Sequence, residues 1–155
     1  MIRFTWKGGI GMGKKLTVNL KAESLSETKT SVRVRNFQIK IDEPPQLGGE
    51  DEAPNPVEYL LAALSGCLNV MAHLIAKEKG IKLNGLKIDI EGELDLDGLM
   101  GKGDVRPGFE KITVKIHPET DAPEGKLKEW LKEIERRCPV SDNISNVTPV
   151  KITLK

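Results

Sequence analysis

The chain has 155 residues, of which 38% are hydrophobic and 30% are charged, and its formal net charge is +1. This length suits one hydrophobic core, so we expect a single domain over residues 1–155. The small net charge gives no electrostatic preference for nucleic acid or for an anionic membrane, and we predict that the protein binds neither. The first residues, MIRFTWKGG, hold no hydrophobic run of signal-peptide length, which predicts a cytoplasmic protein with reduced cysteines.

Three segments in the first third of the chain alternate hydrophobic and polar residues. They cover residues 15–23, 30–36 and 37–42, and a period of two predicts half-buried strands. The following segment, EPPQLGGEDEAPNP, is rich in proline and glycine. It predicts a loop that runs over the surface or over a site.

A long helix is predicted after this loop. Asn55 and Pro56 are suited to the N-cap and the first turn, and Glu58 follows Asn55 at the spacing of a capping box. We expect the helix to end near Lys79, before Gly80.

This helix carries no charged residue from Tyr59 to Ala76. Its uncharged part touches the lower length limit for a membrane span. Its polar residues, its many alanines and the soluble character of the rest of the chain favour a helix buried in a domain or an oligomer. We therefore predict no membrane span.

The second half of the chain repeats the order of strands and then a helix. Residues 86–96 and 111–117 alternate as strands, residues 122–137 form an amphipathic helix, Pro139 ends it, and residues 148–155 form a last strand. Strands that are grouped apart from the helices indicate an α+β fold.

Cys67 lies in the middle of the uncharged helix. Its neighbours at helical spacing are all hydrophobic, namely Leu60, Ala63, Leu64, Val70, Met71 and Leu74. A buried, inert thiol is the common role of a free cysteine. A reactive thiolate would need a positive group from another segment, because the middle of a helix is far from the N-terminal dipole. Both interpretations are open at this point.

Cys138 lies at the end of the second helix, before Pro139. The helix C-terminus disfavours a thiolate, whereas Arg136 and Arg137 favour one. The two arginines also complement the helix dipole without any catalytic role. Cys138 is better suited to attack an oxidised partner than to be oxidised first.

The two histidines do not complete a site with the cysteines. His73 lies about 240° around the helix from Cys67 and cannot act as its base. Neither His73 nor His117 has the spacing of a zinc motif with Cys67 or Cys138. We predict no metal.

The run DEPPQLGGEDEAPNPVEYLLAALSGCLNVMA, followed 71 residues after its cysteine by CPVS, resembles the superfamily of osmotically inducible protein C (OsmC) and organic hydroperoxide resistance protein (Ohr). The resemblance covers roughly residues 30 to 155 and is to the OsmC-like branch. It implies an α+β, OsmC-like fold, with antiparallel sheets around long central helices. It also implies an intertwined homodimer in which two central helices pack back to back.

The resemblance further implies a thiol peroxidase for organic hydroperoxides. Cys67 would react first and become a sulfenic acid, and Cys138 would resolve it as a disulfide. An external dithiol, such as a lipoyl-type donor, would reduce the disulfide, and no cofactor is needed. The hydrophobic stripe around Cys67 favours a hydrophobic hydroperoxide as the substrate.

The sequence departs from the family pattern at the arginine. Ohr proteins carry a Gly-Arg-Asp-Gly turn, which is missing here. The nearest equivalent is Arg35, with Arg33 as an alternative that shares its strand face. The role that the resemblance implies is to hold Cys67 as a thiolate and to orient the peroxide.

A second departure concerns the carboxylate. In Ohr the helix opens Asn-Pro-Glu, whereas here Glu58 is displaced by one residue. It also lies about 180° around the helix from Cys67. Glu58 is therefore either a catalytic partner of the arginine or a helix cap.

Two other functions fit the same residues. One is a non-catalytic OsmC-like dimer that binds a small lipid-like or aromatic ligand in the hydrophobic pocket. The other is a structural dimer in which the thiols are merely buried.

Overall fold

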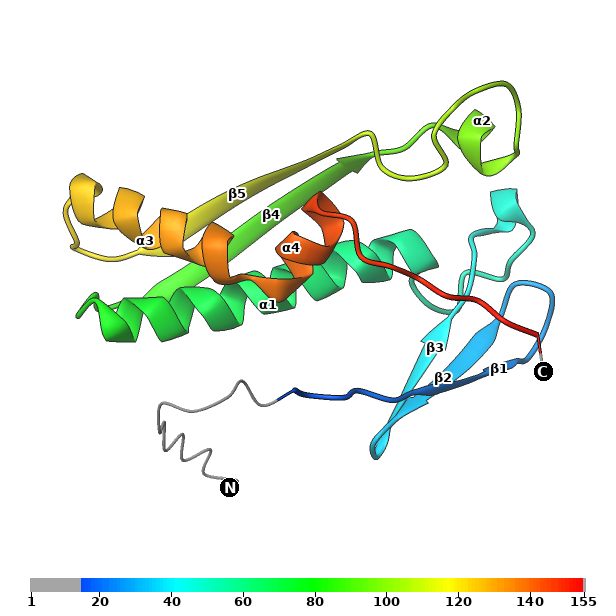
Figure 1. Ribbon diagram of the computed structural model, residues 1–155, viewed down its shortest axis with the longest axis horizontal. Coiled ribbons are helices and arrows are strands. Elements are labelled where there is room, and N and C mark those ends of the chain that lie inside the picture. The colour runs from blue at the N-terminus through cyan, green and yellow to red at the C-terminus, as the bar shows by residue number, and fades with distance from the viewer. Residues whose placement is uncertain (1–14, 155) are drawn as a thin grey trace. The chain divides into compact units, whose positions relative to one another are not determined.

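The computed structural model of the protein describes residues 15–154 and confirms the α+β class (Figure 1). The chain divides into two compact units, one ending at Pro54 and the other beginning at Asn55. The expectation that both belong to a single domain stays a prediction, as does the homodimer.

The N-terminal unit is a three-stranded antiparallel sheet in the order β1-β2-β3. Its strands are β1 (Lys21–Ser24), β2 (Thr30–Val34) and β3 (Phe37–Ile41). The first predicted strand was too long, because residues 15–20 have no regular secondary structure and no neighbouring strand in the described chain. A strand needs such a neighbour to satisfy its backbone hydrogen bonds.

The β2–β3 hairpin corrects the predicted position of Arg35. Val34 pairs with Phe37, so Arg35 and Asn36 form a two-residue turn between the strands. Arg35 has a φ of 54°, in the left-handed region that an arginine seldom occupies. Arg35 therefore does not share a strand with Arg33, which lies within β2.

The loop after β3 contains a short 3-10 helix, η1 (Pro45–Leu47), and is organised by Asp42. The Asp42 side chain is fully buried. It accepts hydrogen bonds from the Thr28 hydroxyl at 3.0 Å and from the backbone N–H groups of Glu50 and Glu52 at 3.2 Å each. Burial by itself would raise the pKa of Asp42, but these hydrogen bonds hold it below its ordinary value.

The C-terminal unit begins with the long helix α1 (Pro56–Glu78). Its predicted start is confirmed: the Asn55 side chain accepts from the Glu58 N–H at 2.9 Å, and the Glu58 carboxylate accepts from the Asn55 N–H at 2.8 Å. Its predicted end is confirmed as well, since Lys79 is the C-cap and Gly80 has a φ of 61°.

The remaining elements of this unit pack around α1. They are β4 (Gly85–Glu93), α2 (Leu96–Leu99), β5 (Lys111–Glu119), α3 (Glu124–Arg137) and α4 (Pro139–Ser145). The strands β4 and β5 form an antiparallel hairpin that runs beside α1, and α3 and α4 also pack on α1 (Figure 1). The core formed between them contains Leu64, Leu68, Ala72, Ile75, Ala76, Ile81, Trp130, Ile134 and Cys138.

Of two predictions for the end of the chain, one is confirmed and one was wrong. The helix predicted to stop at Pro139 is α3, which ends at Arg137. Pro139 also begins α4, because a helix tolerates proline in its first turn. The predicted last strand, residues 148–155, is absent over its described part, 148–154. Its alternating residues Val150, Ile152 and Leu154 are 79%, 91% and 102% exposed, so the segment has the strand pattern without a strand beside it.

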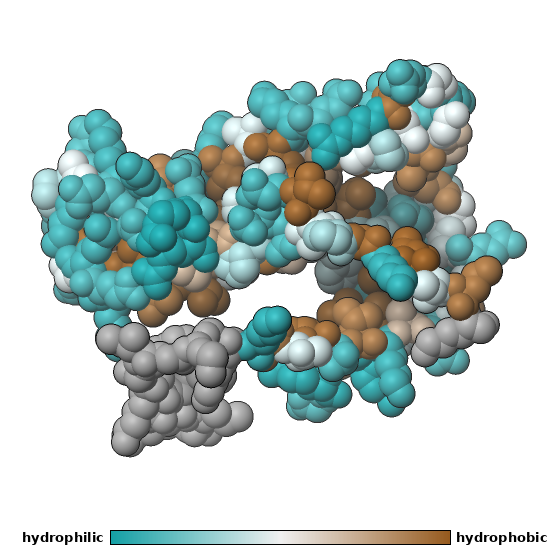
Figure 2. All heavy atoms as spheres, in the orientation of Figure 1, coloured by the Kyte–Doolittle hydropathy of each residue, from teal (hydrophilic) through white to brown (hydrophobic). Residues whose placement is uncertain are grey.

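Hydrophobic side chains also reach the surface elsewhere on the described chain (Figure 2). On α1 they include Leu60, Val70 and Leu74. By length and composition alone α1 could cross a membrane, a test that the core helix of a soluble protein also passes. The absence of a membrane span and the cytoplasmic location stay predictions.

Candidate functional site

The structure brings the two cysteines together. Cys67 lies in the middle of α1 and is partly buried, and Cys138 follows α3 and is 1% exposed. Their Sγ atoms are 3.0 Å apart, and both are free thiols. Because a disulfide bond is about 2.05 Å long, a movement of about 1 Å would join them. We call Cys67 and Cys138 the thiol pair.

Packing between α1 and α3 explains this approach. The amphipathic helix predicted over residues 122–137 buries Trp130 and Ile134 against α1, where they are 2% and 0% exposed, whereas Leu131 is 39% exposed. The Trp130 indole N–H also donates to the backbone carbonyl of Ala72 at 2.9 Å. This contact fixes the position of α3 along α1, and therefore the point at which α3 ends beside Cys67.

Cys138 is the junction between two helices. Its N–H donates to the carbonyl of Ile134 at the end of α3, and its own carbonyl accepts from the N–H of Asp142 in α4, both at 3.0 Å. Its Sγ accepts from the Ser141 N–H at 3.4 Å. Cys138 is thus the C-cap of α3 and the N-cap of α4.

The surroundings of Cys67 favour its neutral form. Burial raises the pKa of the Cys67 thiol, and so does its hydrogen-bonded contact with Cys138, whereas a hydrogen bond from the Val140 backbone N–H acts in the opposite direction. No cation is among the groups that set this pKa in the described chain. A thiolate on Cys67 therefore needs positive charge from a group other than those that set its pKa in this arrangement.

The two arginines before Cys138 are both paired with carboxylates. Arg136 contacts Glu133 of the same helix, and Arg137 contacts Glu78 at the end of α1. Each arginine holds the pKa of its partner carboxyl below the ordinary value. Their charges thus serve ion pairs, of which the one between Arg137 and Glu78 has no signal in the sequence spacing.

Two cavities of the C-terminal unit are lined in part by residues of α1 and α4, the helix that carries Cys67 and the helix that begins after Cys138, but by neither cysteine. One has a volume of about 590 Å³, and its hydrophobic lining consists of Leu60, Phe109, Ile112, Val140 and Ile144. The other has a volume of about 320 Å³ and is lined in part by Leu64, Leu68 and Ser141. Val140 borders the first cavity and also contacts the Cys67 thiol through its backbone N–H. Val140 is therefore shared by this cavity and by the surroundings of Cys67.

The two candidate arginines lie in the N-terminal unit. The Arg35 guanidinium stacks over the Phe37 ring at 5.0 Å from its centroid. Arg33 and Arg35 line one cavity of about 570 Å³ together with Lys21. This unit therefore presents a concentration of positive charge, and the role of Arg35 toward Cys67 stays a prediction.

Glu58 is used as a helix cap. Both halves of its capping box with Asn55 are present, which agrees with the interpretation of Glu58 as a helix cap. Its catalytic role stays a prediction.

The two histidines have positions and contacts that do not involve the thiol pair. His73 is exposed on α1, and His117 pairs with Asp89 at 2.9 Å on the exposed face of the β4–β5 hairpin. Among residues 15–154 no group of three or more His, Cys, Asp or Glu side chains could hold a metal ion.

The sequence interpretation missed the backbone N–H groups of Val140 and Ser141, which point at the two sulfurs. A signal for them exists in CPVS, because a cysteine before a proline can cap a helix that the proline begins. The lining residues Phe109 and Ile144 had no such signal, since the fold alone brings them to α1.

Comparison with known proteins agrees with the resemblance. Residues 49–153 match the family model of the OsmC-like protein. The chain is 30% identical over 121 residues to a hydroperoxide reductase of Mycoplasma genitalium, covering 77% of this chain and 80% of that protein.

Solved structures agree on the fold. An OsmC-like protein from Mycoplasma pneumoniae superposes with a TM-score of 0.74 at 23% identity, covering 88% of this chain and 91% of that one. An organic hydroperoxide resistance protein OsmC from Legionella pneumophila gives 0.61 at 22% identity, covering 85% and 91%. These matches confirm the predicted fold, and the chain belongs to the OsmC-like protein family.

Proposed function

We propose that the protein is a thiol peroxidase that reduces organic hydroperoxides, with Cys67 as the reacting thiol and Cys138 as the resolving one. The observation that carries the proposal is the 3.0 Å separation of the two sulfurs at the junction of α3 and α4. Two free thiols this close favour a reversible disulfide over two unrelated buried cysteines. The hydroperoxide reductase of Mycoplasma genitalium supports the same class of activity.

The chemistry proceeds in three balanced steps. The Cys67 thiolate attacks the terminal peroxide oxygen, the O–O bond breaks, and the alkoxide takes a proton and leaves as an alcohol. The Cys138 thiol then attacks the Cys67 sulfenic acid, which forms the disulfide and releases water. An external dithiol, such as a lipoyl-type donor, reduces the disulfide and becomes oxidised itself. No metal or organic cofactor takes part.

The substrate is a hydrophobic hydroperoxide. The cavity of about 590 Å³ beside Val140 has a hydrophobic part, and Arg106, Glu110 and Lys111 also line it. An alkyl or aryl group gains from burial against the hydrophobic part, and a water-like molecule does not. We expect cumene hydroperoxide to be reduced faster than hydrogen peroxide.

In this proposal Arg35 supplies positive charge to Cys67, because no cation is among the described groups that set the pKa of this thiol. Its left-handed backbone is a strained conformation for an arginine, and such strain is concentrated at functional positions. This favours Arg35 over Arg33. Glu58 remains a candidate partner for this arginine, although its carboxylate caps α1.

The proposal includes a homodimer. Leu60 and Leu74 lie seven residues on either side of Cys67 on α1, and they are 41% and 43% exposed. A second copy that covers this stripe would bury hydrophobic surface beside the thiol. It would also offer residues 148–154, which have the residue pattern of a strand, a strand to pair with. Light scattering during size-exclusion chromatography should give twice the mass of one chain. The mass of one chain would contradict the dimer.

The peroxidase is tested by following peroxide consumption with a dithiol reductant. The wild-type protein should turn over many times. The Cys138→Ser variant, given one equivalent of peroxide without reductant, should stop at a Cys67 sulfenic acid and form no internal disulfide, because the resolving thiol is missing. A wild-type protein that consumes none, with both thiols still free, would contradict the proposal.

A ligand-binding function is the second candidate, because the same hydrophobic cavity could hold a lipid-like or aromatic molecule without chemistry. It requires binding that persists in Cys67→Ser together with a wild-type protein that does not react with peroxide. Titration of both proteins with a fluorescent fatty acid distinguishes the two functions when it is combined with the turnover assay.

A further inference from the structure

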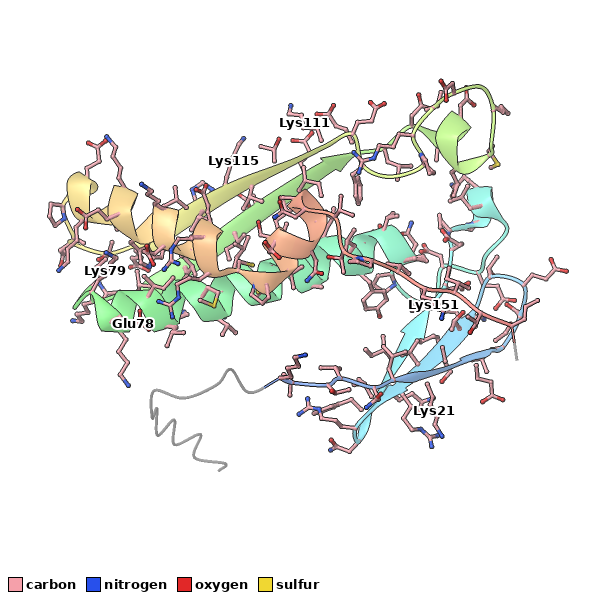
Figure 3. All side chains as sticks on the ribbon, in the orientation of Figure 1. Lys21, Glu78, Lys79, Lys111, Lys115 and Lys151 are labelled. Atoms are coloured by element: carbon pink, nitrogen blue, oxygen red, sulfur yellow. The ribbon has the colours of Figure 1, made fainter. Side chains whose placement is uncertain are left out.

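The residue before Cys138 ties two helices together. The Arg137 guanidinium donates through Nη1 and Nη2 to the two oxygens of Glu78, at 2.5 and 3.1 Å. Glu78 is the last residue of α1 and Arg137 is the last residue of α3, and Figure 3 marks Glu78 at that end of α1. We call this ion pair the helix clamp. It joins the helix that carries Cys67 to the helix that leads into Cys138.

The neighbouring arginine provides a contrast within the same turn. Arg136 also makes two bonds to one carboxylate, from Nε at 3.2 Å and from Nη2 at 2.7 Å, but its partner Glu133 lies three residues earlier in α3. This pair stabilises one helix locally and connects nothing to α1. The two adjacent arginines therefore have similar geometry and different mechanical effects.

The helix clamp lies at the C-terminal end of α3, directly before Cys138. Three other polar contacts join α3 to α1 or to the two residues after α1, and they come from earlier turns of α3. They are Trp130 to the Ala72 carbonyl, Lys126 to the Gly80 carbonyl at 3.3 Å, and Glu129 to Lys79 at 3.5 Å. Arg137, by contrast, is adjacent to Cys138 in sequence. It restrains the last turn of α3, from which the Cys138 thiol extends.

The distance between the thiols decides between two fates of an oxidised Cys67. If Cys138 attacks the sulfenic acid, a disulfide forms and water leaves. If a second hydroperoxide oxidises the sulfenic acid first, a sulfinic acid forms, an alcohol leaves, and a dithiol does not reverse the step. The first reaction is intramolecular, so its rate depends on how much of the time Cys138 lies within reach.

We propose that the Arg137–Glu78 clamp is a positioning device that holds Cys138 beside Cys67, so that the disulfide closes before a second hydroperoxide can react. This inference rests on the proposed peroxidase function and adds protection of Cys67 against irreversible oxidation. Arg137 and Glu78 are positioning residues, because neither one contacts the reacting sulfurs.

The test measures the ratio of sulfinic acid to disulfide by mass spectrometry after adding increasing cumene hydroperoxide without reductant. Arg137→Gln and Glu78→Gln should each raise this ratio about two- to fivefold, the range that corresponds to a partly exposed ion pair. Arg136→Gln is the matched control and should leave the ratio unchanged. High salt should raise the ratio of the wild type toward that of Arg137→Gln, because salt screens a partly exposed pair.

The clamp predicts that Arg137→Gln and Arg136→Gln unfold at similar urea concentrations although only Arg137→Gln raises the ratio. It also predicts that the exchanged pair Arg137→Glu with Glu78→Arg restores a low ratio. A purely structural role predicts instead that the ratio follows the loss of stability. Equal ratios in the wild type and in Arg137→Gln would overturn the clamp while leaving the peroxidase in place. A wild type that forms neither disulfide nor sulfinic acid would instead overturn the peroxidase, and the clamp with it.

Discussion

The thiol pair and the two candidate arginines are held by different kinds of structure. Cys67 and Cys138 meet within one unit because Trp130 and Ile134 pack on α1. Arg33 and Arg35 sit on a hairpin of the other unit, where Arg35 is fixed by a strained two-residue turn. The distance between the two sulfurs is therefore a product of core packing, whereas the position of the proposed activating charge depends on a turn. Disulfide formation and thiol activation should respond to different substitutions.

The largest effect is expected at Cys67. Cys67→Ser should abolish turnover, because a hydroxyl does not replace the thiolate as a nucleophile toward peroxide. Assays with cumene hydroperoxide and a dithiol measure this loss. Turnover that persists in Cys67→Ser would show that another residue reacts with the peroxide. The comparison between the thiol pair and the candidate arginines would then not describe the active site.

Trp130→Ala should disrupt the packing of α3 on α1, which brings the two cysteines together. The side chain is 2% exposed and its indole N–H is bonded to the Ala72 carbonyl, so we expect a loss of about 3–5 kcal/mol in the free energy of unfolding. Urea denaturation measures it, with the exposed Lys132→Ala as a control that changes stability by less than about 0.5 kcal/mol. A loss below about 1 kcal/mol would show that α3 is positioned by something other than this packing.

Arg35→Ala should affect the charge and leave the sulfur geometry intact. The burial of Cys67 raises its pKa, and a nearby arginine would lower it. The thiolate is the form that reacts, so removal of the cation should move the rise of iodoacetamide labelling to higher pH, above the ordinary thiol value of about 8.5. Peroxide reduction near neutral pH should slow by about 10- to 100-fold.

Arg33→Ala is the control for this prediction and should leave the labelling profile unchanged. If Arg33→Ala shifts the profile and Arg35→Ala does not, the strand residue is the activating cation. If neither one does, the activating charge comes from another part of the protein.

The smallest effect is expected at Glu58. Glu58→Ala removes the carboxylate that accepts from the Asn55 N–H at 2.8 Å and should cost about 1 kcal/mol of stability. Glu58→Gln keeps a capping side chain but removes the charge, so its stability and its activity should both stay near those of the wild type. A large loss of activity in Glu58→Gln would show instead that the carboxylate partners the arginine.

The comparison also shows which features were predictable from sequence. The capping box at Asn55, the end of α1 before Gly80 and the hydrophobic stripe of α3 are local patterns, and they predicted the elements that bring the cysteines together. The pairing of the two cysteines itself came from the family resemblance, because their 71-residue separation contains no local signal.

The errors have physical reasons. Residues 148–154 alternate like a strand, but a pattern cannot supply the neighbouring strand that its hydrogen bonds require. Arg35 looked like a strand residue because the register Val34 to Phe37, which places it in a turn, is set by pairing across the hairpin. The Arg137–Glu78 clamp joins residues 59 positions apart, a contact that only the packing of α1 and α3 creates.

The most direct test of the central claim is mass spectrometry of the reduced protein after one equivalent of cumene hydroperoxide, beside a sample given one equivalent of hydrogen peroxide. The account predicts the rapid loss of two hydrogens, mapped to a bond between Cys67 and Cys138, and a faster reaction with the organic peroxide. Two unreacted thiols after minutes would contradict it and would favour a protein that binds a ligand in the same fold without redox chemistry.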